Sequence, residues 1–188
     1  MKSISVIFIV AKYPATYGHT SVINNLCHGL NELGHKTAIG AFSFDSDPPK
    51  GVEKVILKKN ELLRSGVASL EYDIIHPHQA RVLYYLLFKK PEKPIVFHYH
   101  AASNIIQELN LKLSMKLFKK RISKFISVSK KASHHLEEWA GKCDDVVIYN
   151  GVDTKFFHPG LEQPYRKGSP QLLFVSVLRK YKKTVDLI

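Results

Sequence analysis

The sequence contains little cysteine and no long apolar run. Its 188 residues include only two cysteines, Cys27 and Cys143, which are far apart and match no metal-ligand spacing. This pattern favours two free thiols in a reducing cytoplasm. No apolar run approaches the ~20 residues that a membrane-spanning helix needs. The apolar start at residues 3–10 is short and is followed at once by Lys12, which favours a buried first strand over a signal peptide.

Acidic residues are also scarce, at 16 against 28 lysines and arginines, for a net charge of +12. Such an excess favours partners that carry phosphate groups, nucleic acid or an anionic membrane surface. Nucleic acid is suggested by charge alone, because no RNA-binding aromatic signature or helix-turn-helix pattern accompanies it. A G-x-G-x-x-G fingerprint is absent, which argues against a nicotinamide-binding domain.

Apolar segments that suit strands alternate with segments that suit helices. The predicted helices cover residues 79–90, 104–120 and about 130–140, together with a first helix whose apolar side is Val22, Leu26, Leu30 and Leu33. We expect Thr20 or Ser21 to cap that first helix and Gly34 to end it. The predicted strands are residues 3–10, 36–42, 52–57, 73–76, 94–100, 124–129 and 145–149.

This alternation predicts an α/β fold with a Rossmann-like, doubly wound parallel sheet. Functional residues of such sheets lie in the loops at the carboxyl ends of the strands. Five of the ten histidines fall there, together with Ser129 and Asn150. These histidines are His19, His76, His78, His98 and His100.

The composition changes near the end of the chain. Asn150-Gly151 is a strong hairpin signal, yet no alternating strand follows it. We predict one domain over residues 1–160, a polar linker over 161–170, and an incomplete second domain that begins with an apolar strand over 171–188.

The order of several segments resembles the GT-B glycosyltransferases, and specifically glycosyltransferase family 4. The resemblance covers nearly the whole chain and is carried by a Gly-bearing loop after the first strand, Gly34-His35 at a helix end, DIIHPH (73–78), VFHYH (96–100), FISVS (125–129), YNGVDTKFFHP (149–159) and LLFVSVLRKYKK (172–183). It implies a retaining enzyme that uses a nucleotide-sugar donor. Residues 1–160 would be its acceptor-side domain, and the Asn150-Gly151 turn would lead out of that domain at the interdomain cleft.

The resemblance also implies roles for individual residues. His100 would lie close to the transferred sugar as the catalytic residue, and Gly18 would let backbone N–H groups approach the diphosphate. The family often has two adjacent glycines here, and His19 takes the second place. The other expected substrate-binding residues are His78, Ser129, Asn150, Asp153, Arg179 and Lys182.

The start of the second domain departs from the family pattern of Gly-Arg-Leu followed by a lysine. Aligning on Lys182 places Val177 in the arginine position, and Arg179 is offset by two residues. Arg179 either binds the diphosphate as the family's arginine does, or its shifted position leaves a weaker diphosphate clamp. The alternative is that these basic residues form a solvated surface segment that binds no ligand. The family's pair of glutamates is absent, so we expect the chain to bind an acceptor better than a donor, and its activity by itself is doubtful.

We expect no metal and no cofactor other than the nucleotide-sugar, because family relatives work without a catalytic metal. His76-Pro77-His78 and His98-Tyr99-His100 leave zinc open as an alternative, since residues i and i+2 of a strand share a face.

Lys112, Lys116, Lys119 and Lys120 are predicted on one side of a helix whose other side carries Ile106, Leu109, Leu113 and Leu117, and Arg121 and Lys124 extend this basic patch. Such a face suits an anionic membrane surface, or it is a solvated face that keeps the protein soluble.

Three functions therefore compete. The leading hypothesis is a cytoplasmic glycosyltransferase, or part of one, with a glycan or lipid-linked acceptor and a peripheral membrane contact. The second is a truncated, inactive module that holds an acceptor or a partner, and the third is the nucleic-acid binder suggested by charge.

Overall fold

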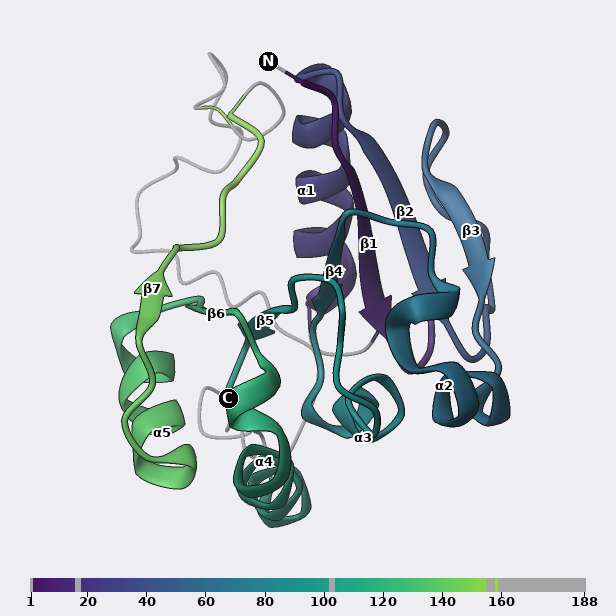
Figure 1. The fold of residues 1–188 in the computed structure, drawn as a ribbon. Coiled ribbons are helices and arrows are strands. Elements are labelled where there is room, and N and C mark those ends of the chain that lie inside the picture. The colour runs from purple at the N-terminus through teal and green to yellow at the C-terminus, as the bar shows by residue number, and fades with distance from the viewer. Residues whose placement is uncertain (1, 16–17, 102–103, 155–157, 159–188) are drawn as a thin grey trace, which may run out of the picture. The chain divides into compact units, whose positions relative to one another are not determined.

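The computed structural model of the chain describes residues 2–15, 18–101, 104–154 and 158. The chain divides into two units, residues 1–151 and 152–188, and every strand and helix given below belongs to the first (Figure 1). The predicted linker over 161–170 and the predicted start of a second domain over 171–188 lie outside the described residues. The domain boundary at residue 160 therefore stays a prediction.

All strands of the first unit pair in parallel. They form a four-stranded sheet in the order β3-β2-β1-β4 and a three-stranded sheet in the order β5-β6-β7. A bridge between Ile75 and Ile95 places β5 beside β4. The strands are β1 (Ser5–Val10), β2 (Lys36–Ala41), β3 (Glu53–Ile56), β4 (Ile74–Pro77), β5 (Val96–Tyr99), β6 (Lys124–Ser127) and β7 (Asp145–Val147). The predicted doubly wound parallel architecture is confirmed.

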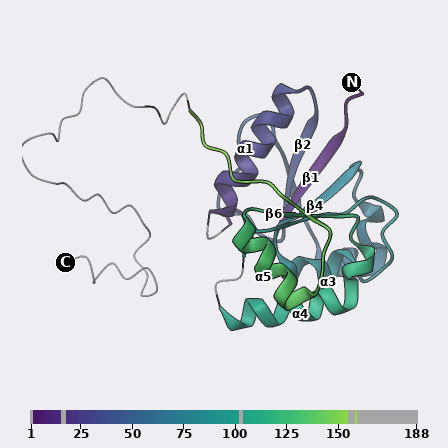
Figure 2. The ribbon, with the colours of Figure 1, turned by 90° about the vertical axis from the view of Figure 1, so that its left-hand side faces the viewer.

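Both faces of the sheet are covered, which explains why β1 is apolar without alternation. Val6, Phe8 and Val10 pack with Ile23 and Cys27 of α1 (His19–Glu32). Ile7 and Ile9 point to the opposite face and join the larger core with the remaining helices. Figure 2 shows α1 on one side of the strands, and α3, α4 and α5 on the other.

Helix α1 starts and ends in left-handed backbone. Its N-cap is Gly18 with φ +81°, so the prediction that Thr20 or Ser21 caps the helix is wrong; the Thr20 hydroxyl instead donates back to the carbonyl of Ala15 (2.8 Å). Gly34, also at φ +81°, ends the helix as predicted. Leu33, the C-cap residue, was predicted on the apolar side of the helix and is exposed.

The region between β3 and β5 differs from the prediction. Residues 59–65 form helix α2 (Lys59–Ser65), followed by a 3-10 turn at Gly66–Ser69. The helix predicted over 79–90 is only a 3-10 turn at Ala80–Val82 and α3 (Leu83–Leu86). The guanidinium of Arg121 donates to the carbonyls of Leu87 and Phe88, just after α3. Carbonyls at a helix end lack partners within the helix, and here Arg121 supplies those partners instead of a further helical turn.

Helix α4 (Ile105–Phe118) is rotated relative to the prediction. Its buried side consists of Leu111, Ser114, Met115 and Phe118. The residues of the predicted apolar side are 51% to 67% exposed, and we call them the exposed stripe: Ile106, Leu109, Leu113 and Leu117. The helix has two apolar stripes, and tertiary packing selected the other one. No helix among the described residues has the length and apolar character for crossing a bilayer.

The predicted basic patch is correspondingly smaller. The ammonium of Lys119 turns toward the end of α5 (Lys130–Ala140) and donates to the carbonyls of Ala140, Gly141 and Lys142. Lys124 pairs with Asp144 (3.1 Å). The lysines left exposed along α4 and just after it are Lys112, Lys116 and Lys120.

Candidate functional site

Five histidines gather at the carboxyl edge of the sheet, and we call them the histidine cluster: His19, His76, His78, His98 and His100. Two come from the end of β4 and two from the end of β5, or just after these strands. Because alternate residues of a strand face the same side, each pair presents both imidazoles to one face. The fifth, His19, is the first residue of α1.

His100 occupies a central position in this cluster. Its ring lies edge to face with that of His19 at a centroid distance of 4.4 Å. It stacks on His98 at 4.5 Å, and its Nε2 is 2.8 Å from Nδ1 of His78. The structure therefore brings three predicted site residues, His19, His78 and His100, together at one edge, beside Gly18.

Burial keeps the strand-end imidazoles of the cluster, those of His76, His78, His98 and His100, neutral. Desolvation, reinforced by the neighbouring imidazoles, lowers the pKa of His76 to about 3 and that of His98 to about 4. The same causes lower the pKa of His100 to about 2 and keep the pKa of His78 well below its ordinary value. At neutral pH these rings are therefore hydrogen-bond donors and acceptors, or ligands, rather than cations.

The backbone at this edge is unusual at two places. Gly18 has φ +81°, and a Cβ there would meet no atom within 4 Å. The glycine is therefore required by backbone conformation rather than by space. Ala101, immediately after His100, has φ 74° without being a glycine, a conformation that costs free energy and is common at functional sites.

A small pocket of about 460 Å³ opens beside the cluster. His19, His78 and His100 line it, and the first turns of α4 supply Asn104, Gln107 and Asn110. Gln79, which also lines this pocket, bonds to the loop that follows β1: its Oε1 accepts from the backbone N–H of Ala11 (3.0 Å). Amides and imidazoles around such a space can hydrogen-bond the hydroxyls of a sugar-sized ligand.

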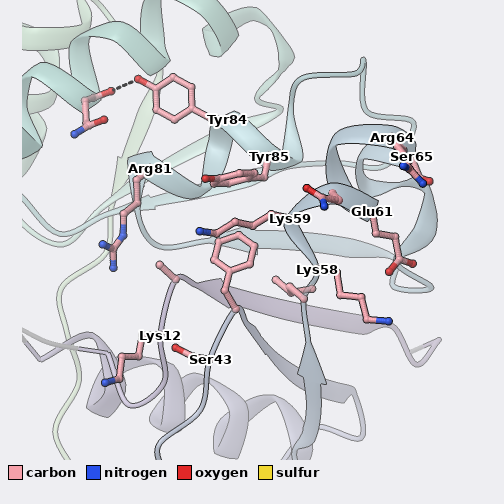
Figure 3. Close-up of a pocket in the computed structure, with 15 residues that line it drawn as sticks. Lys12, Ser43, Lys58, Lys59, Glu61, Arg64, Ser65, Arg81, Tyr84 and Tyr85 are labelled. Carbon is pink, nitrogen blue, oxygen red and sulfur yellow. Dashed lines mark hydrogen bonds between the residues drawn. The ribbon is translucent and has the colours of Figure 1, made fainter.

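A second cavity, which we call the basic cleft, has a volume of about 1440 Å³ and lies at the ends of β1, β2 and β3 (Figure 3). The ammonium of Lys59 lies 5.4 Å from the ring centroid of Phe42 and 5.6 Å from that of Tyr85. Arg81 and Asn110 line both this cleft and the small pocket. The charged residues of the basic cleft are Lys12, Lys58, Lys59, Glu61, Arg64 and Arg81.

Sequence reasoning missed the basic cleft, although the adjacent pairs Lys58-Lys59 and Tyr84-Tyr85 signal it. It also missed a hydrogen-bonded chain from Tyr99 to helices α5 and α4. The Tyr99 hydroxyl is 2.6 Å from Nδ1 of His135, whose Nε2 is 3.3 Å from a carboxylate oxygen of Glu108. This chain fixes both helices against the end of β5.

The remaining predicted site residues lie elsewhere. Ser129 caps α5 by accepting from the backbone N–H of Ala132 (3.1 Å), and it lines neither cavity. Asn150 is exposed in the first unit, and Asp153 is exposed in the second. Arg179 and Lys182 lie outside the described residues.

Comparison with solved structures identifies the fold. The chain is similar to Anabaena HepE in complex with UDP-glucose, with a TM-score of 0.65 at 15% identity over 84% of this chain and 47% of that one. It is also similar to the sucrose-phosphate synthase of Thermosynechococcus elongatus, with a TM-score of 0.61 at 14% identity over 84% and 50%. The chain thus spans about half the length of these structures. It has the fold of the N-terminal half of GT-B glycosyltransferases, as predicted.

Comparison with sequences gives the family. No curated protein sequence matches the chain. The family model described as Glycosyltransferase Family 4 matches residues 17–156. This range includes the whole histidine cluster and the lining of both cavities except Ala11 and Lys12. The resemblance inferred from the order of the motifs is therefore confirmed. This protein belongs to glycosyltransferase family 4.

Proposed function

We propose that the described domain is the acceptor side of an enzyme that transfers a sugar from a nucleotide-sugar to an acceptor, with retention of configuration. Membership of the family supports the reaction class. The main support for the location of the site is that His19, His78 and His100 lie in contact beside Gly18 at the carboxyl edge of the sheet. A ligand of a doubly wound fold binds at this edge.

Each group has a role that its environment suits. Departure of the nucleoside diphosphate develops negative charge, which the N-terminus of α1 after Gly18 stabilises through its dipole and backbone N–H groups. His100 is neutral because burial lowers its pKa, so it orients a sugar hydroxyl by hydrogen bonding. Since HepE binds UDP-glucose, UDP-hexoses are the first donors to test. Arg179 and Lys182 are proposed to contact the diphosphate, and Asn150 and Asp153 to border the donor site.

The basic cleft supports an anionic acceptor. Its ammonium and guanidinium groups attract phosphate or carboxylate, and its aromatic rings stack on the faces of sugars. Because Arg81 and Asn110 line the cleft as well as the small pocket, an acceptor held in the cleft would extend its reacting hydroxyl toward His100. Saccharides linked to a lipid phosphate combine both features.

Helix α4 supports a peripheral contact with the cytoplasmic face of an anionic membrane. The exposed stripe is apolar, and Lys112 and Lys116 flank it on one side. Apolar side chains bordered by lysines suit the boundary between headgroups and acyl chains. Each lysine near an anionic surface contributes ~1 kcal/mol to the free energy of membrane binding.

Transfer is tested with protein expressed from its uninterrupted reading frame, whether that frame ends at Ile188 or continues. We expect release of UDP from a panel of UDP-hexoses to require an acceptor, and His100→Ala to lower kcat/KM by roughly 100-fold. His28→Ala is the matched control, because His28 is exposed on α1. Binding of acceptor without transfer from any donor would instead indicate an inactive binding module, and equal rates for His100→Ala and wild type would remove the role of His100.

Membrane contact is tested by co-sedimentation with vesicles with and without anionic lipid. Replacing Lys112, Lys116 and Lys120 with glutamate, or Leu113 and Leu117 with serine, is expected to abolish salt-sensitive binding. The control with the same change of net charge replaces the exposed residues Lys36, Lys50 and Lys90. If the α4 lysine variant and the control lysine variant lose the same amount of vesicle binding, the net positive charge of the protein, and not α4, attracts the vesicles.

A further inference from the structure

We propose that His76, His78 and His98 form a binding site for a transition-metal ion, for which zinc is the best match. The proposal goes beyond sugar transfer, which needs no metal at this position. It also replaces our expectation from the sequence that the chain binds no metal.

The three imidazoles are positioned by rigid backbone. His76 and His78 lie at alternate positions at the end of β4, and His98 lies in the neighbouring strand β5. One ring nitrogen from each residue can be chosen so that all three nitrogens lie within 4.8 Å of one another. Zn–N bonds of about 2.0–2.1 Å bring tetrahedral ligand nitrogens to roughly 3.3 Å, so binding an ion requires the three rings to shift toward one another.

Each of the three histidines has a buried ring nitrogen without a hydrogen-bond partner among the described residues. Nε2 of His76, Nε2 of His78 and both ring nitrogens of His98 are buried and have no hydrogen-bond partner among the described residues. Buried polar side-chain atoms nearly always have a partner in native proteins. Three such imidazoles side by side therefore point to a shared ligand, and a cation that accepts nitrogen lone pairs satisfies all three at once.

The surroundings of His78 resemble those of a metal ligand. Its Nδ1 is 2.8 Å from Nε2 of His100. In the tautomer where Nδ1–H of His78 donates to His100, the lone pair of His78 lies on Nε2, the unsatisfied atom. A hydrogen bond from the second ring nitrogen is the usual arrangement that orients a metal-bound imidazole.

The donor set determines which metals fit. No carboxylate among the described residues joins the three histidines, so calcium and magnesium, which require oxygen ligands, are unsuitable. Three imidazoles suit zinc and leave a fourth coordination position. Metal binding requires neutral imidazoles, and burial already keeps these rings neutral at pH 7.

The test uses untagged protein treated with a chelator and then titrated with Zn²⁺ by calorimetry. We expect one equivalent to bind and the melting temperature to rise. His98→Gln is expected to weaken binding by more than about 100-fold, because loss of an orienting group alone weakens it 10- to 100-fold. The double variant His28→Gln/His134→Gln, which removes two exposed histidines, is expected to bind as wild type does.

A second measurement covers the case in which His98→Gln fails to fold. Co²⁺ added to the chelator-treated wild type is expected to give the intense visible absorption of a tetrahedral site, displaced by Zn²⁺. The proposal is overturned if the absorption is absent, or if the exposed-histidine variant loses binding as His98→Gln does. Neither readout depends on sugar transfer, so failure of this proposal is distinct from failure of the proposed function.

Discussion

The imidazole of His19, in the first turn of α1, meets the imidazole of His100, just after β5, edge to face at a centroid distance of 4.4 Å. These residues are far apart in the sequence. They meet because β1 lies between β2 and β4, so the chain leaves β1 toward one half of the sheet and returns for the other. Such a reversal of strand order opens the crevice in which ligands of doubly wound folds bind.

Stability of the metal-free domain is expected to fall as the pH is lowered from 7 to 5. The folded-state pKa values of His76 and His98 are lowered to about 3 and about 4, whereas an unfolded imidazole titrates near 6.5. In this interval the unfolded chain binds protons that the folded chain does not, so each residue contributes up to about 1.4 kcal/mol per pH unit. Urea unfolding at three pH values measures the slope, and a flat profile would contradict the prediction.

The same substitution at two glycines of the α1 region is expected to have opposite effects. Gly18→Ala costs about 1 kcal/mol, because its left-handed backbone is strained for any residue with a Cβ. Gly29→Ala, inside the helix, stabilises by up to about 1 kcal/mol. A Cβ at either position would meet no atom within 4 Å, so packing does not confuse the comparison. Chemical denaturation compares the two variants, and a shift of the same sign in both would be inconsistent with a purely conformational role for Gly18.

Lysines of the predicted basic patch are expected to differ in role, because some stabilise the fold and others bind vesicles. Lys119→Met should destabilise the fold by about 1–2 kcal/mol, because it removes hydrogen bonds to the last carbonyls of α5 and to those just beyond. Lys116→Met should change stability by less than about 0.5 kcal/mol and weaken vesicle binding instead. Thermal unfolding and co-sedimentation of both variants distinguish them, and equal effects on stability would show that the lysines are equivalent.

The two thiols are expected to differ in reactivity. Cys27 is fully buried, and burial raises its pKa to about 12. Cys143 is half-buried, and burial raises its pKa as well. A colorimetric disulfide reagent should therefore detect one thiol, that of Cys143, in the folded protein and both in urea. Detection of both thiols under native conditions would mean that α1 opens readily from the sheet.

The sequence was sufficient for the sheet, because the apolar strands are buried on both faces and carry a strong signal. Periodicity was not sufficient for α4, where Ile106, Leu109, Leu113 and Leu117 form as regular a stripe as the buried one. The choice between the stripes depends on the shape of the core, which the pattern of one helix does not contain. The short α3 depends in a similar way on Arg121, a partner distant in the sequence.

The candidate site was predictable where strand ends supply it. Placing histidines at the carboxyl ends of two adjacent strands foretold that His78 and His100 lie together. The basic cleft was not foreseen, since it joins Phe42, Lys59 and Tyr85 from three segments that are separate in the sequence. Their cation–π contacts exist only after the strands and helices have assembled.

Helix α4 has one residue that belongs to two surfaces. Ile106 lines the small pocket and is also the first member of the exposed stripe, which then extends for roughly 16 Å to Leu117. A change at Ile106 would therefore alter the mouth of the pocket and the outer surface together, whereas changes at Leu113 or Leu117 would alter only the outer surface. Engineers who wish to retarget one property without disturbing the other should leave Ile106 unchanged.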